Sequence, residues 1–210
     1  MNGLKHLKNP KKFIYLISPN KIVENNFYFH LENLFKTKKV QFFQLRLKKE
    51  KPKYLIRIGK KINKMCKKYK VKLIINDFPD LVKKIGADGC HIGQRDTKFL
   101  ETRKILKKKI IGVTCHNSIK LAKKATYEGA NYLAVGAFFK TKTKKVKFRS
   151  SIKDLINIKK ITNLPIVAIG GINNKNYKKL LLNNAKFLAI SSYIWNNKKF
   201  TPEEAIKKLI

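Results

Sequence analysis

Eight short apolar runs, each followed by a segment with apolar residues at helical spacing, predict a closed (β/α)8 barrel of the TIM type. The connections between successive runs are too long for hairpins, so the strands should run parallel. The length of 210 residues suits one such barrel, and we expect a single domain over residues 1–210. An open doubly wound sheet is the alternative, but no GxGxxG pattern follows any run.

The first four strands are predicted where β-branched and aromatic residues cluster, at residues 13–18, 40–46, 72–76 and 89–92. The helices that follow them are predicted at 25–36, 52–69, 80–86 and 97–106. Pro52 should open the second helix, because proline is favoured at the first helical position. Asp80 is interpreted as the cap of the third helix, which should stop at Gly86, and Asp88 as a turn residue.

The last four strands are predicted at residues 110–114, 131–136, 165–169 and 187–190. Ser118 should cap a helix that ends at Gly129, and further helices are expected at 152–162, 174–184 and 202–209. The connection at 137–151 is longer than the roughly 2 to 6 residues usual in such units. It carries several lysines and two threonines, which favours a functional loop.

The formal net charge is +38, which raises the question of a nucleic-acid partner. Only 5 of the 50 basic residues are arginines, and the lysines are spread over every predicted helix. Specific recognition of phosphates and bases favours the planar arginine fork. The charge is therefore interpreted as surface composition, with no specific nucleic-acid partner.

The cysteines and the start of the chain indicate a cytoplasmic protein. Cys66, Cys90 and Cys115 lie far apart and form no CxxC pair, so they are interpreted as reduced, buried thiols. The basic start is followed by an apolar run over only residues 13–17, too short for a signal core or a membrane span. A homo-oligomer is left open.

Rare acids gather in one part of the chain. Four of the five aspartates lie between residues 73 and 96. Asn76 and Asp77 end the third strand, whereas His91, Gln94 and Asp96 follow the fourth. Carboxylates at neighbouring strand ends suit a hard cation, so Asp77 and Asp96 are predicted to bind Mg²⁺. His91 could instead be a hydrogen-bonded core histidine.

Polar residues end the other strands too, and in such barrels all carboxyl ends line one site. They are Gln44, Arg46 and Lys48; Thr114 and His116; Thr141, Thr143 and Lys144; Gly170 and Gly171; and Ser191 and Ser192. Cations, acids for a metal and hydroxyls describe a site for a diphosphate, with a second phosphate near the last two strands. This combination suggests a transfer reaction in which diphosphate leaves. The two glycines could also simply form a tight turn.

These stretches resemble the thiamine-phosphate synthase family, in the order that the family has them. They are QLRLK, LIIND, GADGCHIGQRD, IIGVTCHN, YLAVGAFFKTKTK, VAIGGI and AISS, which with the first strand span residues 13–192. The resemblance implies a (β/α)8 transferase of thiamine biosynthesis. Such an enzyme joins a hydroxymethylpyrimidine diphosphate to a hydroxyethylthiazole (carboxy)phosphate and releases diphosphate.

The resemblance also implies roles for individual residues. Lys144, Arg46 and Thr114 would be catalytic, and Asp77 and Asp96 would hold Mg²⁺. Substrates would be bound by the residues of four strand ends: Gln44, Leu45, Arg46, Leu47 and Lys48; Asn76 and Thr114; Thr141, Lys142, Thr143 and Lys144; and Gly171, Ile190 and Ser191. Thr114 stands where the family usually has serine.

Some positions depart from the family pattern, and two other functions stay open. Leu47 replaces a common acid, Ala137 and Lys140 replace common prolines, and Phe78 stands where arginine is frequent. A thiazole tautomerase of the same family is one alternative, with His116 for proton transfer. It would have no diphosphate to bind, so the retained cations and acids argue against it. A lysine-rich RNA-binding protein is the other, but no recognition motif is present.

Overall fold

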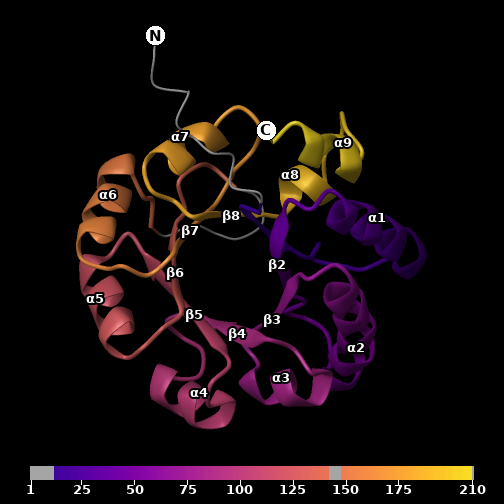
Figure 1. Cartoon of the computed structure of the whole chain (residues 1–210), viewed down its shortest axis with the longest axis horizontal. Helices are drawn as coiled ribbons and strands as arrows, with labels where there is room; N and C mark the ends of the chain where they lie inside the picture. Colours follow the sequence, from indigo (N-terminus) through magenta and orange to yellow (C-terminus); the bar gives the residue numbers. More distant parts are fainter. Residues whose placement is uncertain (1–11, 142–147, 210) are drawn as a thin grey trace.

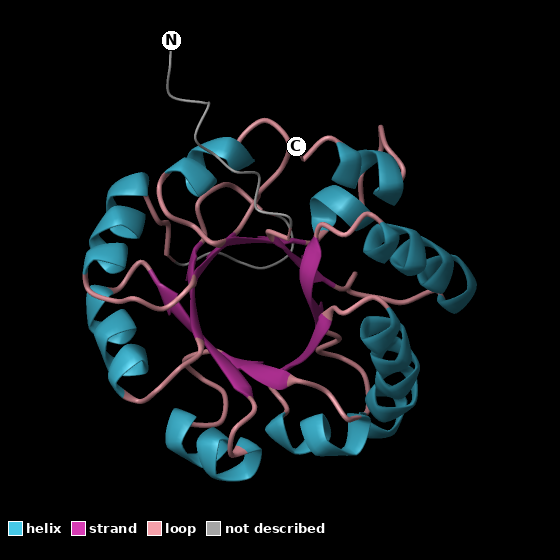
Figure 2. Ribbon diagram, in the orientation of Figure 1, coloured by secondary structure: helices cyan, strands magenta, loops and turns pink. Residues whose placement is uncertain are grey.

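The chain forms a closed barrel of parallel strands, surrounded by helices (Figure 1, Figure 2). The structure is a computed structural model that describes residues 12–141 and 148–209. Its strands pair in chain order, and β8 closes the ring on β1. They are β1 Ile14–Ile17, β2 Val40–Leu45, β3 Lys72–Asn76, β4 Gly89–Ile92, β5 Ile110–His116, β6 Tyr132–Gly136, β7 Ile166–Ile169 and β8 Phe187–Ile190. The predicted (β/α)8 fold class is confirmed, whereas the single domain over residues 1–210 stays a prediction.

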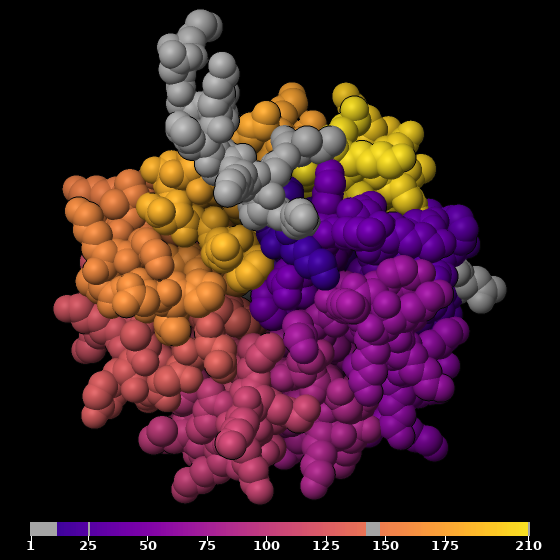
Figure 3. Space-filling view, viewed as in Figure 1, coloured from indigo at the N-terminus to yellow at the C-terminus, as the bar shows by residue number. Residues whose placement is uncertain are grey.

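The helices follow the strands around the ring, and the space-filling view shows their colours in chain order (Figure 3). They are α1 Glu24–Lys36, α2 Pro52–Lys68, α3 Pro79–Ile85, α4 Phe99–Leu106, α5 Ile119–Tyr127, α6 Ile152–Lys160, α7 Tyr177–Leu182, α8 Ser192–Trp195 and α9 Pro202–Lys207. Within the described ranges, none of them combines the length and the apolar character that crossing a bilayer requires.

The local signals for helix ends were mostly correct. Pro52 opens α2, the Ser118 side chain accepts the Leu121 N–H at the start of α5, and Gly86 ends α3 in the left-handed conformation at φ 79°. One interpretation was wrong. Asp80 does not cap α3, because Pro79 is already helical and Asp80 lies inside the first turn. There its negative charge interacts favourably with the positive end of the helix dipole.

Three elements differ from the prediction in extent. The last β-α unit contains the extra short helix α8, α7 covers only the middle of the predicted 174–184, and β5 continues to His116 through an irregularity after Thr114. Before α7, side chains replace helical hydrogen bonds, because the Asn176 side chain accepts from the Asn173 N–H at 2.9 Å. Such local side-chain bonds compete with the helix.

The inside of the barrel is an apolar layer with polar residues at its carboxyl end. Its buried residues are Tyr15, Phe42, Ile74, Tyr132, Ala134, Val167 and Ala189. Alternate residues of a strand share one face. Gln44 and Asn76 therefore point inward, two residues beyond Phe42 and Ile74. The outward faces of the strands pack against the helices in a separate, larger core.

Gly112 makes room for the largest side chain of this layer. A Cβ atom at Gly112 would lie 1.9 Å from Cζ of the Tyr132 ring on the neighbouring strand. Tyr132 is 2% exposed and packs edge-on against Tyr15, with ring centroids 5.6 Å apart. The glycine in IIGVT is therefore a packing requirement of the barrel interior.

We expect Gly112→Ala to lower the free energy of unfolding by about 3 kcal/mol or more, since the ring and the strands that hold it cannot both move aside. Gly129→Ala is the control. Gly129 has φ 88° and no atom within 4 Å of an added Cβ, so only backbone strain of about 1–2 kcal/mol is expected there. Urea unfolding of both variants measures the difference. Equal losses would contradict the packing role.

Candidate active site

Two carboxyl groups lie side by side at the ends of β3 and β4. Asp77 directly follows β3 with φ 64°, and its backbone N–H donates to the His91 carbonyl oxygen at 2.9 Å. Asp96 accepts a hydrogen bond from the Gly93 N–H at 2.7 Å. Burial raises the pKa of Asp96, and the neighbouring Asp77 carboxyl raises it further. The structure thus brings together the two acids that the sequence singled out.

Two cations from the end of β2 face these acids. Lys48 Nζ lies 2.9 Å from Asp77 Oδ2, with about half of the lysine side chain exposed. Burial lowers the pKa of Arg46, while the negative charges of Asp77 and Asp96 act to raise it. The pair of acids is therefore bordered by a half-exposed ammonium and a half-buried guanidinium, which can both bind an anion.

The acid pair fits a divalent cation. Two negative carboxylates this close repel each other, and a cation between them would remove the repulsion. No cluster of three or more His, Cys, Asp or Glu that could hold a metal occurs in the described part of the chain. The protein would thus supply two carboxylates, and water or substrate oxygens would supply the rest, which is how proteins commonly hold Mg²⁺.

Ser18 positions Arg46, a role that the sequence analysis missed. Ser18 is 1% exposed, and its Oγ accepts from the Arg46 N–H at 3.0 Å and donates to the Arg46 carbonyl oxygen at 3.2 Å. The Ser191 hydroxyl donates to the Ser18 carbonyl oxygen at 3.1 Å. The ends of β1, β2 and β8 are thereby tied together. A serine at the last position of an otherwise apolar run was the available signal.

His91 connects the site to the barrel interior. Its Nε2 lies 2.8 Å from the Thr114 hydroxyl, and its Nδ1 lies 3.0 Å from the Tyr132 hydroxyl. Gln94, which was predicted to face the site, donates its side-chain amide to the Thr114 carbonyl oxygen. His91 is thus the hydrogen-bonded histidine that the sequence analysis considered, and it also touches the predicted catalytic Thr114.

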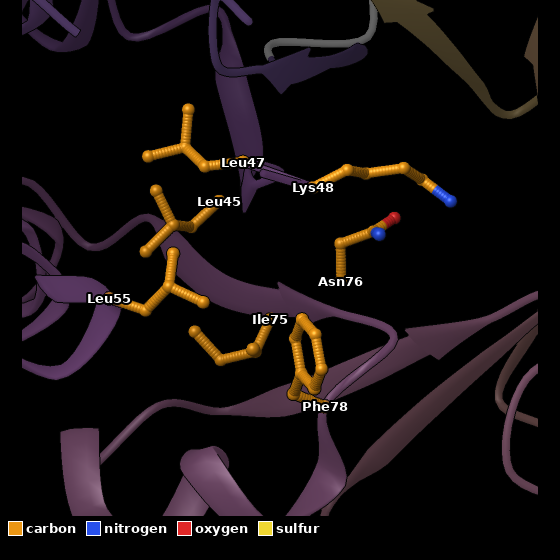
Figure 4. Close-up of a pocket in the computed structure, with 7 residues that line it drawn as sticks. All are labelled: Leu45, Leu47, Lys48, Leu55, Ile75, Asn76 and Phe78. Atoms are coloured by element: carbon orange, nitrogen blue, oxygen red, sulfur yellow. The ribbon is translucent and has the colours of Figure 1, made fainter. Parts of the chain in front are cut away.

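Leu45 and Leu47 face away from the acids. They line a small pocket with Leu55, Ile75 and Phe78. Lys48 and Asn76 also line it, but the polar ends of their side chains point away from the leucines (Figure 4). Ile190, at the end of β8, is buried in the core under the helices. If these three predicted residues contact a substrate, they do so through backbone groups.

Gly170 and Gly171 hold the segment after β6. A Cβ at Gly171 would lie 2.4 Å from the Lys140 carbonyl oxygen, and Gly171 has φ 65°. The Phe139 N–H donates to the Gly170 carbonyl oxygen at 3.1 Å. The turn that the sequence analysis considered is therefore present, and the close backbone approach explains why both positions are glycine.

The ends of the long connection meet at the same edge of the barrel. The Ser150 N–H donates to the Ala137 carbonyl oxygen at 2.9 Å, and the Asn117 amide donates to the Arg149 carbonyl oxygen at 3.2 Å. The His116 ring packs on Phe148, with centroids 4.9 Å apart. Thr141 is described, whereas the predicted Lys142, Thr143 and Lys144 lie outside the described residues.

Comparisons with known proteins identify the relatives of this chain. The family model described as thiamine monophosphate synthase matches residues 14–194. A thiamine-phosphate synthase of Pelagibacter ubique is 65% identical over 206 residues, covering 98% of this chain and 100% of the relative. One of Clostridium acetobutylicum is 37% identical, covering 92% of each chain.

A solved structure shows the same fold. The thiamine phosphate pyrophosphorylase of Pyrococcus furiosus superposes with a TM-score of 0.82 at 24% identity, covering 95% of this chain and 94% of that one. The match of the family model over most of the barrel and the similarity to full-length relatives give one conclusion: the chain belongs to the thiamine monophosphate synthase family.

Proposed function

We propose that this chain condenses a hydroxymethylpyrimidine diphosphate with a hydroxyethylthiazole (carboxy)phosphate, releasing diphosphate and forming thiamine phosphate. The 65% identity to a thiamine-phosphate synthase over its full length supports this transferase activity. The observation that carries the proposal is the pairing of Asp77 and Asp96 beside Lys48 and Arg46, because a diphosphate bound with a metal ion uses both carboxylate ligands and cations. The tautomerase and RNA-binding alternatives are not favoured.

The pyrimidine diphosphate is assigned to the mouth between β2 and β5. Arg46 and Lys48 would bind its phosphate oxygens, and Lys48 can exchange its contact with Asp77 for one with the substrate. Gln44 and Asn76, which are almost fully buried on the inward face, would hold the pyrimidine end. Thr114 offers a hydroxyl from the next side of the mouth.

Asp77 and Asp96 would hold Mg²⁺, which when bound would neutralise charge on the departing diphosphate. In the reaction, the carbon–oxygen bond to diphosphate breaks and its electron pair leaves with the oxygen. The lone pair of the thiazole nitrogen forms the new carbon–nitrogen bond. Arg46 and Lys48 stabilise the developing negative charge. The apolar layer below the site would exclude water from the inner side of the bound pyrimidine.

The thiazole phosphate is assigned to the other half of the mouth. Gly171, Ile190 and Ser191 would bind its phosphate through backbone N–H groups and the serine hydroxyl. Thr141 and Thr143 would contact its carboxylate and phosphate region. Lys142 belongs to the same segment, and Lys144 would act on the diphosphate. The roles of Thr141, Thr143 and Lys144 rest on the TxTK spacing.

Partners beyond the small-molecule substrates are also proposals. We expect no specific nucleic-acid binding, and a homo-oligomer stays open. A cytoplasmic location is supported by Cys66, Cys90 and Cys115, all buried and unpaired, as in a reducing compartment.

Incubation with both phosphorylated substrates and Mg²⁺ tests the function. Wild type should release diphosphate and thiamine phosphate in equal amounts. Asp77→Asn and Asp96→Asn should reduce the rate by at least two orders of magnitude, since each removes a charged ligand. Asparagine tolerates the left-handed conformation at residue 77, so the fold should survive, as circular dichroism can check. Full activity of both variants would contradict the metal assignment.

The acid pair also predicts how metal affects stability. The pKa of Asp96 is raised in the folded state, so the folded protein binds that proton more tightly than the unfolded chain does. The free energy of unfolding therefore falls as the pH rises from the pKa of Asp96 in the unfolded chain to its pKa in the folded protein. Above these pKa values the ionised Asp96 side chain is therefore less favourable in the folded protein than in the unfolded chain. Mg²⁺ should raise the melting temperature of wild type at pH 7 but not of Asp96→Asn. The same rise in both would show that the ion binds elsewhere.

Lys144→Ala tests the sequence-based role of that lysine. A lysine in contact with diphosphate in a partly desolvated site contributes about 4 kcal/mol, against about 1 kcal/mol or less for a solvated neighbour. We expect condensation to fall by about two to three orders of magnitude, with thiazole-phosphate affinity little changed. Lys145→Ala is the control and should stay within a few fold of wild type. If both variants lose activity alike, Lys144 acts only as one of several positive charges and has no specific role.

A further inference from the structure

A row of four polar groups crosses the apolar interior of the barrel from β1 to β5. The Tyr15 hydroxyl lies 2.7 Å from the Tyr132 hydroxyl, which lies 3.0 Å from His91 Nδ1. His91 Nε2 lies 2.8 Å from the Thr114 hydroxyl at the mouth. The His91 and Tyr132 rings are also stacked, at 13° between their planes, which fixes the imidazole orientation.

The buried Tyr15 end of the row determines which group donates each hydrogen bond. Tyr15 is 2% exposed, and burial raises the pKa values of both Tyr15 and Tyr132, so each hydroxyl keeps a proton to donate. Among the described residues, the Tyr132 hydroxyl is the one hydrogen-bond partner of the Tyr15 hydroxyl. Tyr15 must therefore donate to Tyr132, because the reverse would leave a proton without an acceptor in an apolar layer.

The same reasoning assigns the protons of Tyr132 and His91. The Tyr132 oxygen already accepts from Tyr15, so its own proton goes to its other partner, His91 Nδ1. A neutral imidazole carries a proton on one nitrogen and a lone pair on the other. With Nδ1 as the acceptor, His91 carries its proton on Nε2 and donates to the Thr114 oxygen.

We propose that His91 is a positioning residue, held by Tyr15 and Tyr132 as the Nε2–H tautomer, and that it makes the Thr114 hydroxyl a donor toward substrate. Because the Thr114 oxygen accepts from His91, its own proton is free to point into the mouth. On the proposed function, that proton meets an acceptor atom of the pyrimidine diphosphate. Gln94 holds the Thr114 backbone from the same side.

The assignment explains which residues suit each place. Position 114 needs a hydroxyl, which threonine and serine both provide. Position 91 needs a donor aimed at residue 114 and an acceptor aimed at residue 132, which imidazole provides at fixed geometry. Gly112, next to both on the inward face, provides the space for the Tyr132 ring.

The tautomer can be observed directly by nitrogen NMR of protein labelled with ¹⁵N-histidine. The chain has 4 histidines, and His91→Asn assigns the His91 signals by their disappearance. The proposal predicts a protonated Nε2 and an unprotonated Nδ1 at neutral pH. A protonated Nδ1, alone or together with Nε2, would overturn it. The measurement needs no catalysis, so it decides the tautomer even if condensation is not observed and the proposed function fails.

A double-mutant cycle tests whether His91 acts through Thr114. His91→Asn retains a polar group only on the Tyr132 side, and it should lower kcat/KM by about tenfold to a hundredfold, as removal of an outer supporting partner does. In a Thr114→Val background, His91→Asn should change kcat/KM less than about twofold, because the hydroxyl that it orients is gone. Equal losses in both backgrounds would mean that His91 has only a packing role.

His91→Gln is the matched rescue variant, since its side-chain amide nitrogen reaches the place of Nε2. It should recover most of the activity that His91→Asn loses. If the two variants are equally impaired while both unfold at the same temperature, donation to Thr114 is excluded.

Discussion

Closure of eight parallel strands imposes one constraint on every strand, because only alternate side chains can point inward. The last inward position of each strand then opens on one common mouth, so residues far apart in sequence converge there. Gln44 and Asn76 occupy such positions above Phe42 and Ile74. The apolar layer beneath them is buried, so the polar side chains of the mouth meet water only from the open end of the barrel. The chemistry of the site follows from this separation of an apolar floor and a polar rim.

The charged side chains at the rim neutralise one another only in part. Asp77 and Asp96 repel each other, while Lys48 reaches one of them and Arg46 is half-buried near both. Such a set of charges is satisfied more completely by a metal ion and a diphosphate than by the protein alone. Within the described ranges, most lysines of the helices are exposed to solvent, where a charge costs little and binds little. The high net charge is therefore a separate matter from the anion site proposed at the rim.

Local patterns predicted the barrel and the strand-end residues well, because each depends on neighbours in sequence. Pro52, Gly86 and Ser118 mark helix ends through their own backbone chemistry. The prediction that Asp80 caps the helix was wrong because the preceding residue, Pro79, can also start a helix. The Tyr15–Tyr132 contact joins residues 117 positions apart, and no single strand pattern contains it. The inward direction of Arg46 was predictable. The serine that ends the first apolar run was a visible signal, but its partner Arg46 could not be read from the sequence, since that bond depends on the register between β1 and β2.

The central claim is that the acid pair and its neighbouring cations form one site for metal and diphosphate together. Isothermal titration of inorganic diphosphate into the protein, with and without Mg²⁺, tests this coupling most directly. The account predicts at least tenfold tighter binding with Mg²⁺ in wild type, and no such gain when Asp77 and Asp96 are both replaced by asparagine. Equal diphosphate affinity with and without Mg²⁺ in wild type would contradict it.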